Sequence, residues 1–377
     1  MNDSTPVSRR RFLRESPAAG TLLATGAVAA ATSTRSEAAD TDADPRKTLR
    51  VGALNISVYS HLAAHWARLI NGSMSFTGMR ITHCWDINPE AAKGFARGNQ
   101  CTAVQNFDDM VGKVDAVIDG GYYNHAVNHV LMAPYLKAGL PCLINRPFAN
   151  SVAKTRSIVE LARTHKAPIL VPSAFGHNQV VTEARAFAGS SRISGSHATT
   201  GAEDYPTHGS HGLYFLSRAI TDVGNPIISV AHRAQHWHKP PAVLTFEHHD
   251  KEGRTFYGTL HSGNFGVGML QIHTDKHGNG RPFTITIGSD PLYRDTGFWI
   301  PALWAFQQMA TSGQMPQTYD QVLMKQMAYM AGWRSHLVEK GQPVRLEDVP
   351  ADWNAPVTLP QRPGETPYFE MLQKQFA

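Results

Sequence analysis

Two stretches decide the fold of this 377-residue chain: residues 49–70, LRVGALNISVYSHLAAHWARLI, and residues 114–149, VDAVIDGGYYNHAVNHVLMAPYLKAGLPCLINRPFA. Short apolar runs with the length of buried strands occur in and between them, at residues 49–54, 81–85, 116–118 and 142–144. Apolar residues at helical spacing follow, at residues 61–70 and 126–137. Strands that alternate with helices at this spacing predict a parallel sheet, with its ligand site at the carboxyl ends of the strands.

Beyond residue 172 the pattern changes to longer strand-like runs, at residues 227–235, 242–249, 254–261, 266–274 and 283–287. Turn-forming residues separate several of these runs, which predicts an open, largely antiparallel sheet. Helical spacing recurs at residues 151–166, 211–220, 299–309 and 319–337. We therefore expect an α/β chain, with an N-terminal Rossmann-like parallel-sheet domain followed by an α+β domain with an open, largely antiparallel sheet.

The N-terminal segment is typical of a twin-arginine export signal. Residues 8–14 read SRRRFLR, an Ala/Gly-rich stretch follows, and residues 36–38 (SEA) fit a small-residue cleavage site. A disordered basic tail is the alternative. We expect a periplasmic protein exported by the twin-arginine route, with no further stretch that spans a membrane. The expected segments are a signal peptide at 1–39, a linker at 40–48, a Rossmann-like domain at 49–172, an α+β domain at 173–349, and a C-terminal tail at 350–377.

The composition excludes two classes of site. The formal charge of +5 comes partly from arginines of the export segment, and no Lys/Arg run occurs elsewhere, so we expect no nucleic-acid partner. Cys84, Cys101 and Cys142 are an odd number without CxxC spacing, which indicates buried thiols and argues against a disulfide framework or a zinc site.

The order of motifs resembles the Gfo/Idh/MocA family (glucose-fructose oxidoreductase / inositol dehydrogenase). The family's Gly-rich turn, acidic strand end, VDAV run and AGLPxLxxKPxA segment correspond here to residues 51–60, Asp86, residues 115–125 and residues 138–149. The resemblance implies an oxidoreductase of a sugar, glycoside or polyol with tightly bound NAD(H), or a glycosidase that works by transient oxidation at the same site. It also implies a homo-oligomer assembled through the open sheet.

The expected cofactor-binding turn departs from the family pattern. A dinucleotide fingerprint has three glycines, and Asn55, Ser57 and Ser60 stand at those positions. Asn tolerates left-handed backbone, Ser can donate to a phosphate, and the following helix N-terminus favours an anion. Asp86 is placed to accept the ribose hydroxyls and would favour NAD over NADP, or else it caps a helix at residues 89–97.

The lysine of the family's Lys-Pro pair is replaced by Arg146, which follows Asn145. Arginine keeps the positive charge and polarises an oxygen, but it does not give up a proton, so we expect a clamp on the reacting oxygen. An arginine that pairs with a carboxylate at the sheet end is the alternative. Asn145 is expected on the cofactor side, and His125 matches the family's histidine near the cofactor ribose, although ordinary packing also explains it.

Tyr122 and Tyr123 follow a predicted strand, at the expected mouth of the cleft. They are candidates for stacking on the substrate or the nicotinamide, and roofing the sheet is the alternative. The sequence does not separate these two interpretations.

The family's D-x-G-x-H segment is only partly present. Gly209 and His211 match it, but Thr207 stands in the Asp position. We expect His211 to act as the general base, with His208 and Arg146 completing the catalytic set. Asp204 and Thr207 are the expected substrate-side residues, and Asp204 is a candidate to orient the imidazole. A histidine that caps the helix at 211–220 is the alternative.

The same histidines allow a different class of function. His208, His211 and Asp204 together carry donors that suit a divalent metal, although no signature spacing is present. This alternative predicts a metal-dependent, glycoside-active enzyme without nicotinamide. A third class is a sugar-binding protein that kept the fold and lost catalysis.

Overall fold

The computed structural model describes residues 48–57, 60–72, 78–122, 124–173, 175–201, 205, 209–236, 239–275, 282–287, 299–356 and 366–376. Contacts divide the chain into residues 1–42 and residues 43–377, and every element named below belongs to the second unit. Within the described residues no helix is long and apolar enough to cross a membrane.

The first sheet contains six parallel strands in the order β3-β2-β1-β4-β5-β6. Their bounds are β1 Leu49–Leu54, β2 Met79–Trp85, β3 Thr102–Ala103, β4 Ala116–Asp119, β5 Cys142–Ile144 and β6 Ile169–Leu170. The strand order reverses between β1 and β4, so the crevice at their carboxyl ends is the topological switch point where open α/β sheets bind ligands. The expected Rossmann-like parallel sheet is confirmed.

The helices of this first domain are η1 Leu62–Trp66, α1 Ala67–Asn71, α2 Pro89–Asn99, α3 Asn128–Leu131, α4 Ala133–Lys137 and α5 Val152–Thr164. Two of them depart from the prediction. The helix expected at residues 61–70 begins with a π-helical turn, η1. The helix expected at 126–137 is divided into α3 and α4, because Pro134 lacks the N–H that would continue the helical ladder.

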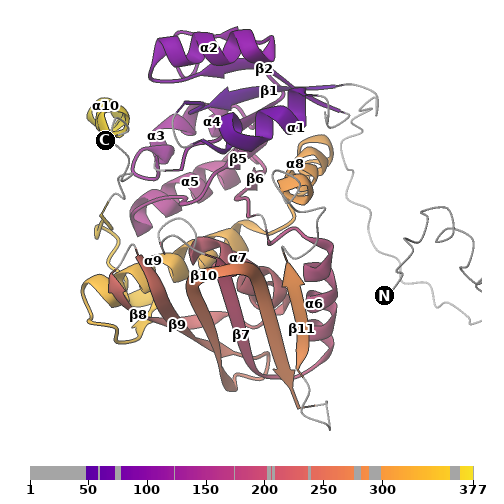
Figure 1. Cartoon of the computed structure of the whole chain (residues 1–377), viewed down its shortest axis with the longest axis vertical. Helices are drawn as coiled ribbons and strands as arrows, with labels where there is room; N and C mark the ends of the chain where they lie inside the picture. Colours follow the sequence, from indigo (N-terminus) through magenta and orange to yellow (C-terminus); the bar gives the residue numbers. More distant parts are fainter. Residues whose placement is uncertain are drawn as a thin grey trace, which may run out of the picture. The chain divides into compact units, whose positions relative to one another are not determined.

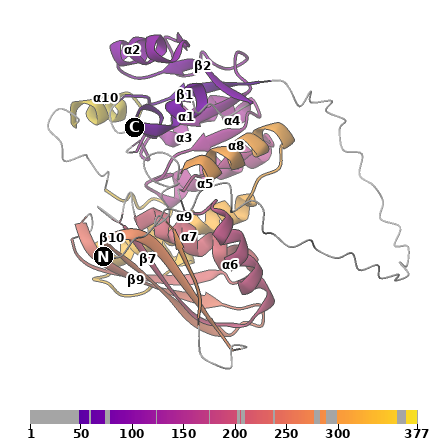
Figure 2. The same cartoon turned by 45° about the vertical axis from the view of Figure 1, so that its right-hand side comes forward.

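Helix α8 (Ile300–Ser312) packs against the first domain although it lies late in the sequence (Figures 1 and 2). Its buried Leu303 and Phe306 belong to the core that contains Val51 and Ile118 of the first sheet. Trp299, just before the helix, is buried in the same core. The helix thereby brings Trp299 close to the first sheet.

The second sheet has the order β11-β10-β9-β8-β12, with β7 paired to β10. Its strands are β7 Ile193–Gly201, β8 Ile227–His236, β9 Lys239–His249, β10 Thr255–Thr274, β11 Phe283–Ile287 and β12 Val344–Arg345. The runs predicted at 254–261 and 266–274 both lie within β10, which pairs with β9 in its first part and with β11 in its last part. The expected open, mostly antiparallel sheet is confirmed, and the sequence did not predict β7.

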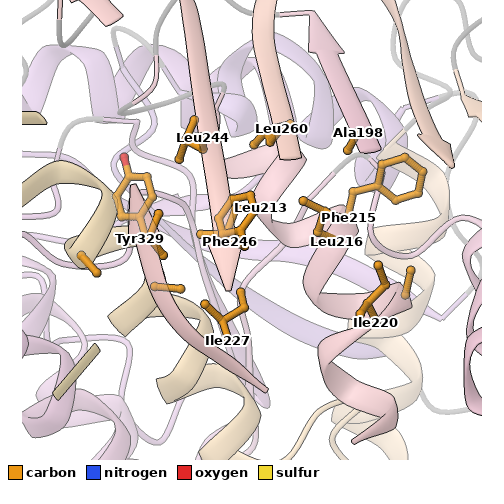
Figure 3. Packing of buried hydrophobic residues seen from close by; sticks show 14 of the residues in the cluster. Ala198, Leu213, Phe215, Leu216, Ile220, Ile227, Leu244, Phe246, Leu260 and Tyr329 are labelled. Carbon is orange, nitrogen blue, oxygen red and sulfur yellow. The ribbon is translucent and has the colours of Figure 1, made fainter. Parts of the chain in front are cut away.

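Helices α6 (Gln179–Ser190), α7 (Ser210–Ala219) and α9 (Tyr319–Leu337) belong to the second domain (Figure 1). Figure 3 shows the packing beneath the sheet, where Leu213 and Leu216 of α7 lie close to Phe246 of β9. This core fixes the position of α7, whose first residues are Ser210 and His211.

Short elements in the described residues of the second domain include η3 Thr221–Val223 and η6 Leu346–Asp348. The segment expected to be only a C-terminal tail ends in a helix, α10, at Thr366–Phe376. Its Leu372 is buried in the core of the first domain.

Candidate functional site

The turn after β1 is held by hydrogen bonds within the protein. Asn55 adopts left-handed backbone with φ of 55°, which Asn tolerates where glycine is absent. Its side-chain Nδ2 donates to Asp119 Oδ1 at 2.7 Å. The backbone amides of Ile56 and Ser57 each donate to Asp86 Oδ2 at 2.9 Å. These two amides lie in the turn whose donors a dinucleotide phosphate would need.

Asp86 lies directly after β2, as predicted, and its carboxylate is already engaged. Oδ1 accepts from the backbone amide of Asn88 at 2.9 Å, and the hydroxyl of Tyr368 in α10 lies 3.4 Å from Oδ2. Burial raises the pKa of Asp86. The N-cap of α2 is Asn88, whose side chain accepts from Glu90 and Ala91 amides, so Asp86 supports that cap and does not form it.

The crevice between β1 and β4 is bridged by backbone contacts. Ser60 forms a β-bridge with Gly121, and the amide of His61 donates to Gly120 O at 2.9 Å. A Cβ placed on Gly120 would lie 2.5 Å from Ser60 Oγ, which is closer than real Cβ contacts come. The close contact between the two crossing segments therefore requires glycine at the end of β4. The three positions after β1 at which a dinucleotide fingerprint has glycine carry other residues.

These contacts decide how well NAD fits the turn in the described conformation. The amides of Ile56, Ser57 and His61 are bonded to protein oxygens, and Ser60 Oγ accepts from the Leu62 amide at 3.2 Å. A pyrophosphate at a Rossmann turn is held by free backbone donors. In the described part of the turn these donors are therefore already occupied, and a pyrophosphate that used them would have to replace their present acceptors. Residues 58 and 59 of the turn lie outside the described residues.

Asp119, at the end of β4, is a buried carboxylate that the sequence reading missed. Its Oδ1 accepts from Asn55 Nδ2, from Asn124 Nδ2 at 2.8 Å and from the Gly121 amide at 3.2 Å. Oδ2 has no hydrogen-bond partner among the described residues. Burial raises the pKa of Asp119 to about 6, although these donors oppose the shift. A polar residue directly after a buried strand is the signal by which it could have been found.

A second group of polar residues lies at the same edge of the sheet, beyond β5. Arg146 donates through Nε and Nη2 to His211 Nε2, at 3.0 and 2.6 Å. His211 Nδ1 lies 3.0 Å from Ser173 Oγ. Because a guanidinium only donates, Nε2 is the accepting nitrogen, and the ring proton therefore sits on Nδ1 and points to Ser173. The structure thus brings together two of the three expected catalytic residues, both buried.

Aromatic side chains surround this pair. The Arg146 guanidinium lies over the Tyr122 ring, 5.2 Å from its centre, and the Tyr122 hydroxyl lies 2.8 Å from His61 Nδ1. His61 stacks on Trp66 at 4.9 Å and meets Trp299 edge-on at 4.2 Å. Tyr122 thus lies beside Arg146, and its role toward a substrate stays a prediction. His61 and Trp299 were not predicted as site residues.

Asn145 and His125 are fully buried. Asn145 Nδ2 donates to the carbonyls of Gly120 and Gly121 at 3.0 Å each, and its Oδ1 accepts from the Arg146 amide. It therefore fixes the start of the Arg146 segment against the end of β4. Burial and, to a smaller extent, Lys154 lower the pKa of His125 to about 3, so this imidazole is neutral. Their roles toward a cofactor stay predictions.

A small cavity lies beside Arg146. It is lined by residues that follow β5 and β6 and by residues of α7 and α9, among them Arg146, Val171, Ser210, Tyr214, Lys325 and Tyr329. Lys325 Nζ lies 3.4 Å from the centre of the Tyr214 ring. Burial lowers the pKa of Lys325 well below its ordinary value, which favours the neutral amine. A lysine in the middle of a buried helix is a signal that the sequence reading did not use.

Four predicted residues lie outside the described ones: Tyr123, Asp204, Thr207 and His208. Among the residues that the structure describes, no group of three His, Cys, Asp or Glu side chains is arranged to hold a metal ion. Because Asp204 and His208 are two of the three expected ligands, the metal alternative stays a prediction.

Comparisons with known proteins agree with this architecture. Residues 51–173 match the GFO_IDH_MocA family, described as an oxidoreductase family with an NAD-binding Rossmann fold. No curated protein matches the chain.

Solved structures extend the likeness to the second domain. The apo scyllo-inositol dehydrogenase from Lactobacillus casei has a TM-score of 0.65 at 12% identity, over 80% of this chain and 99% of that one. The myo-inositol dehydrogenase from the same organism, in complex with NAD(H) and myo-inositol, gives 0.64 at 12%, over 85% and 99%. An oxidoreductase from Agrobacterium radiobacter, in complex with NAD+, L-tartaric acid and magnesium, gives 0.58 at 14%, over 80% and 99%.

The relationship expected from the sequence motifs is confirmed, and NAD agrees with the description of the matched family. Residues 51–173 match the Gfo/Idh/MocA oxidoreductase family, and the chain has the two-domain fold of the inositol dehydrogenases.

Proposed function

We propose that this chain is an NAD-dependent oxidoreductase that acts on a hydroxyl group of a sugar, glycoside or polyol. The observation that carries the proposal is the hydrogen-bonded pair of Arg146 and His211, which lies at the carboxyl edge of the first sheet. Oxidation of an alcohol needs a group that accepts the hydroxyl proton and a positive charge that stabilises the oxygen. The pair supplies both.

His211 is prepared to accept a proton. Its Nε2 carries the free electron pair, to which Arg146 donates in the described conformation. A substrate hydroxyl that enters beside this nitrogen donates its proton to Nε2 and takes the place of the guanidinium. Arg146 then donates to the substrate oxygen, so the exchange leaves each donor with an acceptor.

Ser173 and Tyr122 position these two groups. The Nδ1–H of His211 donates to Ser173 Oγ, which also accepts from the Phe175 amide at 3.2 Å. An acceptor at Nδ1 fixes the tautomer that leaves Nε2 available. Tyr122 presents its ring to the guanidinium and its hydroxyl to His61, which restricts the movement of Arg146 toward the substrate side.

NAD, when bound, supplies the acceptor for the two electrons of the oxidation. Its site must include the first turn, which the described hydrogen bonds close. The choice of NAD is supported by the description of the matched family, and the choice of a polyol by the neighbour solved with myo-inositol.

The proposal is tested by incubating the protein with NAD and each of a panel of inositols, hexoses and glycosides. Formation of NADH is measured by its absorbance. With the substrate that is turned over, His211→Ala should lower kcat by about 10²- to 10⁴-fold, the usual contribution of a general base. His165→Ala is the matched control, because His165 is an exposed histidine at the end of α5.

Full activity of His211→Ala would remove the imidazole from the mechanism and make Lys325 the next candidate base. Absence of NADH formation with every substrate, together with no binding of NAD, would contradict the oxidoreductase proposal itself.

We place the activity in the periplasm, as a homo-oligomer. The twin-arginine pattern at residues 8–14 supports the location, and the exposed Tyr257 and Val243 on strands of the second sheet support contact with another copy. Cell fractionation and the mass of the mature protein in solution test these two points; a cytoplasmic monomer would contradict them.

A further inference from the structure

The C-terminal helix α10 (Thr366–Phe376) lies against the first domain, beside the end of the sheet that carries β1 and β2 (Figures 1 and 2). Its described contacts include groups at the carboxyl ends of these two strands. In a dinucleotide-binding sheet this region receives the adenosine half of the cofactor.

Tyr368 makes polar contacts from this helix. Its hydroxyl lies 3.4 Å from Asn55 Oδ1 and 3.4 Å from Asp86 Oδ2. Burial, with the nearby charge of Asp86, raises the pKa of Tyr368 well above its ordinary value, so the phenol keeps its proton and can donate it. The carboxylate that would accept a ribose hydroxyl is thus in contact with a hydroxyl of the protein.

Two apolar residues anchor the helix beside this contact. Leu372 is 1% exposed, within the core of the first domain. The Phe376 ring packs edge-on against Trp85, with centres 6.0 Å apart, and against Phe107 at 5.3 Å. Trp85 is the last residue of β2, next to Asp86, so the aromatic contact and the hydroxyl contact lie side by side.

Adenosine presents the same two chemical features as this helix. It carries ribose hydroxyls, which donate to a carboxylate at the end of β2, and a flat apolar base, which packs on neighbouring side chains. Tyr368 supplies the first feature and Phe376 the second. The helix and the nucleotide therefore require the same surface.

We propose that α10 is an internal ligand of the adenosine half-site, and that NAD binds only when this helix is displaced. The inference rests on the proposed function, because it assumes that the chain uses NAD. The Tyr368 hydroxyl must leave Asp86 before a ribose can be bound there, and release of Asp86 from the Ile56 and Ser57 amides would free the turn for the pyrophosphate.

The described segment before α10 is fixed independently, since the Ala355 amide donates to Asn150 O at 2.7 Å and Asn150 Nδ2 donates back to Ala355 O at 3.1 Å. Release of α10 therefore does not require release of residues 350–356. Because α10 belongs to the same chain, it competes with NAD at a high effective concentration. The apparent Kd for NAD then equals the intrinsic Kd divided by the fraction of molecules in which the site is open.

Calorimetric titration of the full-length protein with NAD tests the proposal. Leu372→Asp removes the apolar anchor and should lower the apparent Kd at least about tenfold, because the site is then open in most molecules. Tyr368→Phe removes only the hydroxyl that contacts Asp86 and should lower the apparent Kd by a smaller factor. Lys374→Ala, on the exposed side of the same helix, should leave it unchanged. If Leu372→Asp does not fold, Phe376→Ala serves as the second anchor variant.

Equal Kd values for the wild type and the anchor variants would overturn the proposal and leave the oxidoreductase assignment intact. Absence of NAD binding in all folded variants would overturn both. Tighter binding by the anchor variants, with Lys374→Ala matching the wild type, is the predicted result.

Discussion

The turn after β1 and the Arg146–His211 pair occupy the same edge of one sheet, and they use hydrogen bonds in opposite ways. At the turn, the amides of Ile56 and Ser57 are bonded to the carboxylate of Asp86, so the donors that a phosphate needs are occupied by an acidic group. At the pair, a permanent cation donates to a neutral imidazole, an interaction that a polar substrate can replace without loss of hydrogen bonds.

The turn has its donors bonded to a carboxylate, whereas the pair has donors that a substrate oxygen can take over. Binding of an anion at the turn must first break charge-assisted bonds to Asp86, each worth about 1.5–3 kcal/mol. Binding of a hydroxyl at the pair only redirects the Arg146 donors. The two halves of the proposed site therefore differ in which hydrogen bonds must be exchanged before a ligand binds.

The largest expected effect is on the pH dependence of stability and concerns Asp119. This residue at the end of β4 is hydrogen-bonded to Asn55 of the turn after β1. Its folded pKa of about 6 lies above its ordinary value of 3.8. The folded protein therefore holds a proton more firmly than the unfolded chain, and this stabilisation is present below about pH 4 and lost as the pH rises through 6. The shift corresponds to roughly 3 kcal/mol.

Asp119→Asn cannot titrate but keeps an oxygen to accept from Asn55. The unfolding free energy of the wild type should therefore fall relative to that of the variant by roughly 2.4 kcal/mol between pH 4 and pH 7, as measured by urea denaturation. Asp86 also has a raised pKa, but it is present in both proteins and cancels in the difference. A difference that does not change with pH would contradict the assigned burial of this carboxylate.

A smaller effect, on kcat, is expected at Ser173, beside the Arg146–His211 pair. This serine is a positioning residue, because it acts on the substrate only through His211. Ser173→Ala should lower kcat about tenfold, a loss of one hydrogen bond worth about 1.4 kcal/mol, with KM little changed. Ser173→Thr keeps the hydroxyl and should restore kcat. A failure of the Thr variant to restore it would indicate that the position matters only for packing.

The fold followed from sequence patterns because its strands are short, apolar and buried. The runs at Leu49–Leu54 and Cys142–Ile144 were predicted with the bounds that the structure has. Strand β7 (Ile193–Gly201) was missed because its side chains are small or polar, and its pairing with β10 is set by tertiary contact. Helix α10 was missed because the tail before it is rich in proline.

The site was predictable only in part, for a physical reason. Family motifs located Asp86 after β2, Arg146 after β5 and His211 near a helix start, because those positions depend on the local order of strands and helices. They could not show that the Asp86 oxygens accept from the turn or that Tyr368 reaches them, since these contacts join residues up to 313 positions apart. His61 and Ser173 were missed for the same reason, because only folding brings them to Tyr122 and His211.

Hydrogen exchange of the wild-type protein with and without saturating NAD tests the central claim most directly. The account predicts that NAD accelerates amide exchange in residues 366–376, because the helix leaves Asp86 and Trp85, while α7 with His211 keeps its exchange rates. Binding of NAD with the exchange of residues 366–376 unchanged would contradict it, since the helix and the nucleotide would then not share a site.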